Sequence, residues 1–223
     1  MKWRSLEDSG AAADKRSLRE QFAERKELIA KYVPPAAQAV HARAIADLRS
    51  GGIESGVLKP RSIAPDFELR DQNGKLTSRA NLLTAGRLVI CFFRGRWCPF
   101  CVGQLEAMQQ FLPQILAAGA NLVGISPQIV QQNYFMADQH RLGFPLLSDT
   151  GNKVARVPEE QEAIYRRAFV NLPLVNGDDS WQLPFRPYTF WTAMAQCSWQ
   201  RRMPITPNVP SRRKLCSFFG RDS

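Results

Sequence analysis

The chain has 223 residues, of which 44% are hydrophobic and 22% charged, and its 30 Lys and Arg against 20 Asp and Glu give a net charge of +10. This length and composition favour one globular domain with an extension, and they exclude wholesale disorder, collagen-like sequences and solenoids. No apolar run approaches the roughly 20 residues that cross a bilayer. Residues 1–20 lack the apolar core of a secretory signal, so we expect a cytoplasmic protein without a membrane partner.

The positive charge is concentrated near the C-terminus. Residues 183–223 contain seven Lys and Arg and one Asp, which leaves a net charge of only +4 for residues 1–182. A basic face for nucleic acid is therefore not indicated, and we expect no nucleic-acid partner. Residues 184–223 form an irregular basic tail, whose apolar residues follow neither a helical nor an alternating period. Binding of nucleic acid by this tail alone is the alternative interpretation.

Residues 1–58 are predicted to be a helical N-terminal extension. Residues 17–32 combine strong helix formers with helical apolar spacing. Pro34 and Pro35 interrupt this helix, and a second helix is predicted over residues 36–48, ending at Gly51-Gly52. We expect the extension to pack on the main domain. The alternative is a contact between copies of the chain in a homo-oligomer.

Residues 59–183 alternate between strand and helix patterns. Asn73-Gly74 predicts a hairpin between the apolar segments at 67–69 and 76. The continuous apolar run at 88–93 is typical of a strand buried on both faces. Short connections between such elements imply an α/β domain with a parallel central sheet. The further strands are predicted at 121–126 and 144–149, and the helices at 102–116, 129–141 and 159–169.

Cys98 and Cys101 stand two residues apart, directly after a buried strand and at the start of a helix. Free backbone N–H groups and the helix dipole at this position favour a thiolate over a thiol. Arg94 and Arg96 add positive charge nearby, and Pro99 suits a first helical turn. An oxidised Cys98 could then be attacked by Cys101 to give an intramolecular disulfide. This pattern favours redox catalysis.

Three other interpretations of the two cysteines remain open. A zinc site needs two more ligands, and no Cys or His stands at ligand spacing, so we expect no metal. A structural disulfide is unusual in a chain without a secretory signal. Two inert buried thiols are the third interpretation. Cys91 lies inside the apolar strand and is predicted to be an inert small hydrophobic residue.

Four segments together resemble the peroxiredoxin-like branch of the alkyl hydroperoxide reductase and thiol-specific antioxidant (AhpC/TSA) family. The likeness covers roughly residues 60–183. It implies a thioredoxin-like fold, with a central mixed sheet flanked by helices. The four segments are Ala64-Pro65-Asp66-Phe67, Asp71 to Gly74, Phe93 to Cys101, and Asn176 to Trp181.

The resemblance also implies a chemistry. Cys98 would be the peroxidatic nucleophile that reduces hydrogen peroxide or an organic hydroperoxide and becomes a sulfenic acid. Cys101 would resolve it to a redox disulfide, and a thioredoxin-type donor would recycle the pair. No organic cofactor is implied.

The chain departs from the standard peroxidase pattern at two positions. Gly95 stands where typical members have the threonine that orients the peroxide, and Cys91 stands where they have a proline. Arg94 is our candidate for stabilising the Cys98 thiolate, in place of a later arginine of typical members. His140 is a weaker candidate base, expected instead to face solvent from a helix. A thiol–disulfide oxidoreductase without substantial peroxidase activity is therefore the main alternative function.

The tail shows no sequence pattern for the β-hairpin and last helix that a complete thioredoxin-like domain needs after residue 183, so we expect both to be missing. Because Trp191 and Met194 each have a single codon, part of the nucleotide sequence follows from the protein sequence. Read from the third base of each codon, residues 190–195 are compatible with Leu-Asp-Gly-Asn-Gly, a strand end and a turn. We therefore hypothesise that the reading frame slips near residues 182–186, which makes residues 184–223 an out-of-frame tail.

Overall fold

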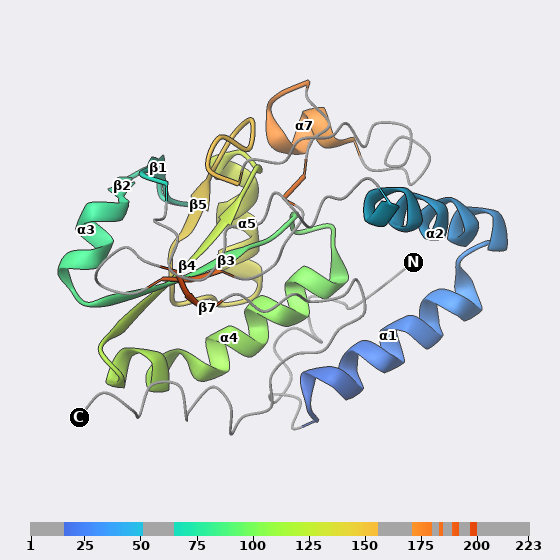
Figure 1. Ribbon diagram of the computed structural model, residues 1–223, viewed down its shortest axis with the longest axis horizontal. Coiled ribbons are helices and arrows are strands. Elements are labelled where there is room, and N and C mark those ends of the chain that lie inside the picture. The colour runs from blue at the N-terminus through green and yellow to red at the C-terminus, as the bar shows by residue number, and fades with distance from the viewer. Residues whose placement is uncertain are drawn as a thin grey trace.

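The computed structural model describes residues 16–50, 65–155, 171–179, 183–184, 189–191 and 197–199. The predicted helix at 159–169 lies outside these residues, as do the start of the N-terminal extension and most of the tail. Figure 1 shows a central sheet with helices on both sides and two N-terminal helices at one end.

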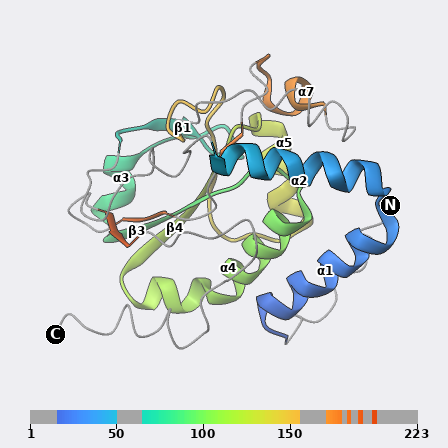
Figure 2. The ribbon, with the colours of Figure 1, turned by 45° about the vertical axis from the view of Figure 1, so that its right-hand side comes forward.

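The N-terminal extension forms the two predicted helices, α1 (Leu18–Tyr32) and α2 (Pro35–Ser50). Ser17 caps α1 in a reciprocal arrangement, since Glu20 N–H donates to the Ser17 hydroxyl and Ser17 N–H donates to the Glu20 carboxylate. Val33 ends α1 in an extended conformation, as expected for a residue before proline. Figure 2 shows α1 running beside α4 of the main domain.

The strands form one mixed sheet, as expected. Within the described residues its order is β2-β1-β5-β4-β3-β6-β7. The three central strands β3, β4 and β5 are parallel, whereas the remaining pairs are antiparallel. The strands are β1 (Glu68–Arg70), β2 (Leu76–Ser78), β3 (Arg87–Phe92), β4 (Ala120–Ser126), β5 (Leu146–Ser148), β6 (Thr189–Trp191) and β7 (Cys197–Trp199).

The predicted hairpin joins β1 and β2. The Asp71 carboxylate accepts hydrogen bonds from the backbone N–H groups of Asn73 and Lys75, at 2.8 and 2.9 Å. Gly74 adopts a φ of +81°, a conformation that side chains disfavour. The prediction from Asn73-Gly74 is therefore confirmed.

In the part of the chain that the structure describes, four further helices connect the strands: α3 (Arg79–Thr84), α4 (Pro99–Ala117), α5 (Val130–Gln139) and α7 (Leu172–Asn176). Helix α4 begins at Pro99, three residues earlier than predicted, because Cys98 acts as its N-cap. The short helices α3 and α7 were not predicted. Each begins with a side-chain cap, from Ser78 and Asn171 respectively, but neither is long enough to show a helical period.

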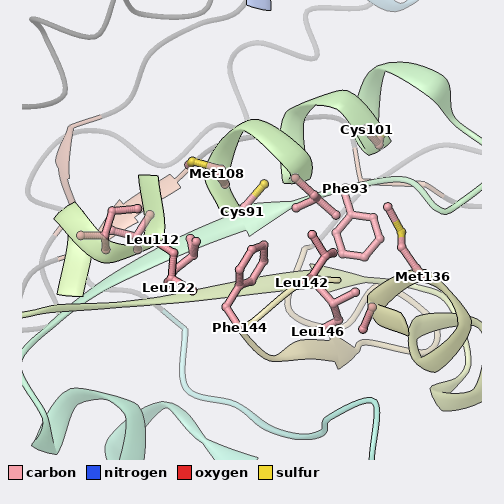
Figure 3. Close-up of a cluster of buried hydrophobic side chains, with 14 of the residues drawn as sticks. Cys91, Phe93, Cys101, Met108, Leu112, Leu122, Met136, Leu142, Phe144 and Leu146 are labelled. Carbon is pink, nitrogen blue, oxygen red and sulfur yellow. The ribbon is translucent and has the colours of Figure 1, made fainter. Parts of the chain in front are cut away.

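Strand β3 is buried on both faces, as its apolar run predicted. Val89 and Cys91 of β3, and Phe93 directly after it, face the cluster formed with α4 and α5, which Figure 3 shows in close-up. Leu88 and Ile90 face a second cluster that includes side chains of α3. This alternation is the period of a strand, and it makes β3 the rigid element from which the Cys98 segment leaves.

The described part of the tail corrects one expectation. We predicted no regular structure after residue 183, but β6 pairs with β3 and β7 pairs with β6, so the two form an antiparallel hairpin. Without β6, the second edge of β3 would leave backbone N–H and C=O groups unpaired. Strands of three residues are too short to show a period, which is why the sequence pattern did not predict them.

Among the helices that the structure describes, none has both the length and the apolar character that crossing a membrane requires.

Candidate active site

Cys98 lies at the carboxyl end of the parallel strands, where α/β proteins commonly place their sites. The loop after β3 leads to Cys98, which is the N-cap residue of α4. The Cys98 sulfur accepts a hydrogen bond from the backbone N–H of Cys101 at 3.4 Å. The sulfur thus occupies the position of a capping oxygen, where the helix dipole favours negative charge.

Arg94 contacts both members of the cysteine pair. Its Nη2 atom lies 3.1 Å from the Cys98 sulfur, and its backbone N–H donates to the Cys101 sulfur at 3.5 Å. The guanidinium also stands over the Trp97 ring, 5.7 Å from the ring centre. The positive charge of Arg94 is therefore held directly against the sulfur that we expect to be the nucleophile.

The two sulfurs differ sharply in acidity. A hydrogen bond from the Cys101 thiol, together with the charge of Arg94 and the Cys101 N–H, outweighs burial and lowers the pKa of Cys98 to about 5. The same hydrogen bond raises the pKa of Cys101 well above that of an ordinary thiol, and burial and the neighbouring charge of Cys98 add to this effect. At neutral pH the pair therefore consists of a Cys98 thiolate and a protonated Cys101.

Neither cysteine takes part in a disulfide, and both are buried. Cys98 is 2% exposed and Cys101 is 6% exposed, and Trp97 and Phe100 pack against the buried cluster to which both cysteines belong. In such surroundings the charge of a nearby arginine acts more strongly than in water.

Cys91 belongs to the core rather than to this pair. Its sulfur accepts a hydrogen bond from Gln104 at 2.9 Å, but complete burial dominates and raises the pKa of Cys91 to about 12. The thiol therefore stays protonated, in keeping with the inert residue that the sequence predicted. Figure 3 shows Cys91 on β3 among the apolar side chains that face α4.

The packing around position 95 explains why a glycine stands there. Gly95 has a φ of +157°, and a Cβ atom there would lie 2.5 Å from Trp97 Nε1 and 2.9 Å from Gln128 Oε1. Gln128 cannot easily move aside, because it is fully buried and hydrogen-bonded. The site therefore has no room for a threonine at this position.

The N-terminal extension packs on the main domain, as we expected, and it does so at the start of α4. The Phe22 ring of α1 meets the Phe100 ring edge to face, with centroids 5.3 Å apart. Arg25 donates to the backbone carbonyl of Pro99, between the two cysteines. Sequence reasoning missed Arg25, because its partner is 74 positions away.

The expectation for His140 was wrong. Its side chain is only 7% exposed and lies 3.1 Å from the Glu106 carboxylate, on α4. The residue follows the end of α5 rather than facing solvent from it. Among the residues that the structure describes, no group of three or more His, Cys, Asp and Glu side chains is placed to hold a metal ion.

Comparison with known proteins identifies relatives for the region around this site. Residues 60–170 match the model of the AhpC/TSA family. Chloroplastic peroxiredoxin Q of Triticum aestivum is 35% identical over 107 residues, which cover 48% of this chain and 49% of that protein. Chloroplastic peroxiredoxin Q of Arabidopsis thaliana is 36% identical over 93 residues, 42% of this chain and 43% of that protein. The chain thus spans about half the length of the curated relatives it matches.

A solved structure supports the fold. Peroxiredoxin 6 of Arenicola marina superposes on 73% of this chain and 72% of its own, with a TM-score of 0.56 at 12% identity. At this identity the likeness shows the fold alone, which is thioredoxin-like. The comparisons also correct one expectation: the predicted cytoplasmic location is contradicted, because the matching curated relatives are chloroplastic proteins.

Proposed function

Residues 60–170 belong to the AhpC/TSA family, and from this premise we propose that the protein is a thiol-dependent peroxidase acting on hydrogen peroxide or organic hydroperoxides. The observation that carries the proposal is the contact of the Arg94 guanidinium with the Cys98 sulfur, at 3.1 Å. A buried thiolate next to a fixed positive charge is the activated nucleophile that peroxide reduction requires.

In the first step, the Cys98 thiolate attacks one oxygen of the peroxide. An S–O bond forms, the O–O bond breaks, and the leaving oxygen takes up a proton to become water or an alcohol. The sulfur is oxidised to a sulfenic acid, and the peroxide is reduced by two electrons. Arg94 stabilises the thiolate beforehand and can donate hydrogen bonds to the oxygens on which negative charge develops.

In the second step, Cys101 resolves the sulfenic acid. It stands three residues along the first turn of α4, with its backbone N–H already 3.4 Å from the Cys98 sulfur. Cys101 gives up its proton and attacks the Cys98 sulfur, an S–S bond forms as the S–O bond breaks, and the departing hydroxide takes up a proton to become water. A dithiol of the thioredoxin type then reduces the disulfide by two electrons and restores both thiols.

The test is mass spectrometry of the Cys98–Cys101 peptide after one equivalent of peroxide. We expect a loss of two hydrogens, which marks a disulfide, and consumption of peroxide when a thioredoxin system is supplied. Cys98→Ser should abolish both results. An unmodified cysteine pair in the parent chain would refute the proposal.

A thiol–disulfide oxidoreductase is the second candidate, favoured by a specific observation. Gly95 leaves the site without the threonine hydroxyl of the standard peroxidase pattern, whereas an acidic first cysteine and a protonated second one also suit disulfide exchange. This activity would reduce insulin disulfides rapidly and turn peroxide over slowly. Comparing the two rates on the same preparation separates the candidates.

A further inference from the structure

Gln128 is a fully buried polar side chain in the loop between β4 and α5, next to the cysteine site. Its Oε1 atom accepts a hydrogen bond from the backbone N–H of Arg96 at 2.8 Å. Its Nε2 atom donates to Oδ1 of Asn133 at 2.9 Å. A single amide therefore joins the segment that precedes Cys98 to helix α5.

The other end of this connection is also fixed. Asn133 is fully buried on α5, where its Oδ1 accepts from the Ser126 hydroxyl at 2.9 Å and its Nδ2 donates to the Ser148 oxygen at 3.0 Å. Ser126 and Ser148 are the last residues of the parallel strands β4 and β5. The Gln128 amide cannot rotate without leaving buried polar atoms unpaired, which is costly.

The segment that Gln128 holds is short and tightly turned. Cys98 N–H donates to the Gly95 carbonyl at 3.1 Å, closing a turn around Arg96. Gly95 lies so close to Gln128 that a Cβ atom would be 2.9 Å from Oε1. Only three residues separate Arg94 from Cys98. The conformation of this turn therefore decides whether the Arg94 guanidinium can reach the Cys98 sulfur.

We propose that Gln128 is a positioning residue for the active site: its amide fixes the turn at Arg96 and thereby keeps Arg94 against Cys98. This inference deepens the proposed function, because it concerns the same thiolate. Among the described residues, no hydrogen bond joins Gln128 to either sulfur, and Gln128 acts through the backbone of Arg96.

The test variant is Gln128→Met, which keeps the length of the side chain but removes the acceptor for Arg96 N–H. The matched control is Ser148→Ala, which removes another hydrogen bond of the same buried network without touching the turn. The readout is the rate of alkylation of Cys98 by iodoacetamide between pH 4 and 9, assigned by peptide fragmentation, together with the midpoint of thermal unfolding.

We expect both variants to unfold at a lower temperature than the parent. Only Gln128→Met should move the alkylation profile to higher pH and slow the reaction at pH 6, roughly fivefold or more. An unchanged profile in a folded Gln128→Met chain would overturn the proposal and leave Gln128 a purely structural role. If Gln128→Met does not fold, the same measurement is made on Gln128→Asn, whose side chain is shorter by one methylene. A shifted alkylation profile supports the proposal, and an unchanged one overturns it. If neither Gln128→Met nor Gln128→Asn folds, the proposal is also overturned, because Gln128 is then required for the stability of the whole domain.

Alkylation does not depend on peroxide. A chain that fails to reduce peroxide, and so refutes the proposed function, would still show whether Gln128 controls the Cys98 thiolate. The two proposals can therefore fail separately.

Discussion

The rings of Phe22 and Phe100 meet edge to face, 5.3 Å apart, and join the first N-terminal helix to the first turn of the helix that carries both cysteines. Phe22 is 3% exposed, although it lies in a segment outside the residues that match the AhpC/TSA family. The extension is thus part of the core beside the site.

Replacing Phe22 with alanine should destabilise the protein. Truncation of a buried phenylalanine leaves a cavity and typically costs about 3–5 kcal/mol in the free energy of unfolding, and we expect about 3 kcal/mol in urea titrations. Tyr32→Ala, in the same helix but 57% exposed, is the control and should cost less than about 0.5 kcal/mol. Equal losses for the two variants would show that α1 does not contribute to the core.

Arg94→Met should raise the pKa of Cys98, because the guanidinium stabilises the thiolate by its charge and by a hydrogen bond. A charge-assisted hydrogen bond of this kind is worth enough to reduce the alkylation rate at pH 6 by about tenfold. Arg96→Met is the matched control. Its guanidinium stands over the Phe135 ring, and its backbone N–H makes the hydrogen bond to Gln128 that holds the active-site turn. Similar losses in both variants would mean that general positive charge, not the Arg94 contact, is responsible.

The reactivity of Cys98 should persist into acid. Its pKa in the folded protein is lowered to about 5 from 9.0, so the thiolate is lost only as the pH falls through about 5. We therefore expect the rate of alkylation, corrected for reagent, to be nearly flat from pH 9 to 6 and half-maximal near pH 5. The urea-unfolded chain provides the reference. A folded protein whose profile follows that of the unfolded chain would contradict the assignment.

Two substitutions at Cys101 separate its two roles. Both Cys101→Ser and Cys101→Ala should stop after one oxidation, leaving a Cys98 sulfenic acid that dimedone traps, where the parent chain forms a disulfide. The hydrogen bond from Cys101 is the largest cause of the lowered pKa of Cys98. Serine retains a donor, so only Cys101→Ala should shift the alkylation profile to higher pH. A disulfide in either variant would identify another resolving cysteine.

The reading-frame proposal for residues 184–223 is tested by the nucleotide sequence. Read from the third base of the codon for Phe190, the gene should encode Leu-Asp and then a glycine-containing turn, followed by a second strand and a helix. The single codons of Trp191 and Met194 already fix some bases of the shifted frame. The bases that test the proposal are therefore the variable ones, in the degenerate codons between these two residues and after them. An early stop codon in the shifted frame would end the proposal.

The order of strands and helices was largely predictable, because local chemistry determines it. The apolar run of β3, the Asn73-Gly74 turn and the Ser17 cap each act within a few residues of the chain. Cys98 and Cys101 were recognisable for the same reason, since a helix N-terminus and a spacing of three positions suffice to set one sulfur against the N–H of the other residue.

The tertiary structure alone decided how the Cys98 thiolate is held. The sequence placed Arg94 and Arg96 on either side of a glycine, and only the fold of the turn shows that Arg94 reaches the sulfur while Arg96 turns toward Phe135. Gln128 and Arg25 act across 32 and 74 positions of the chain. Such contacts arise from the packing of elements that are distant in sequence, and no local pattern records them. The sequence determined the reactive pair, and the packing around it determined its charge.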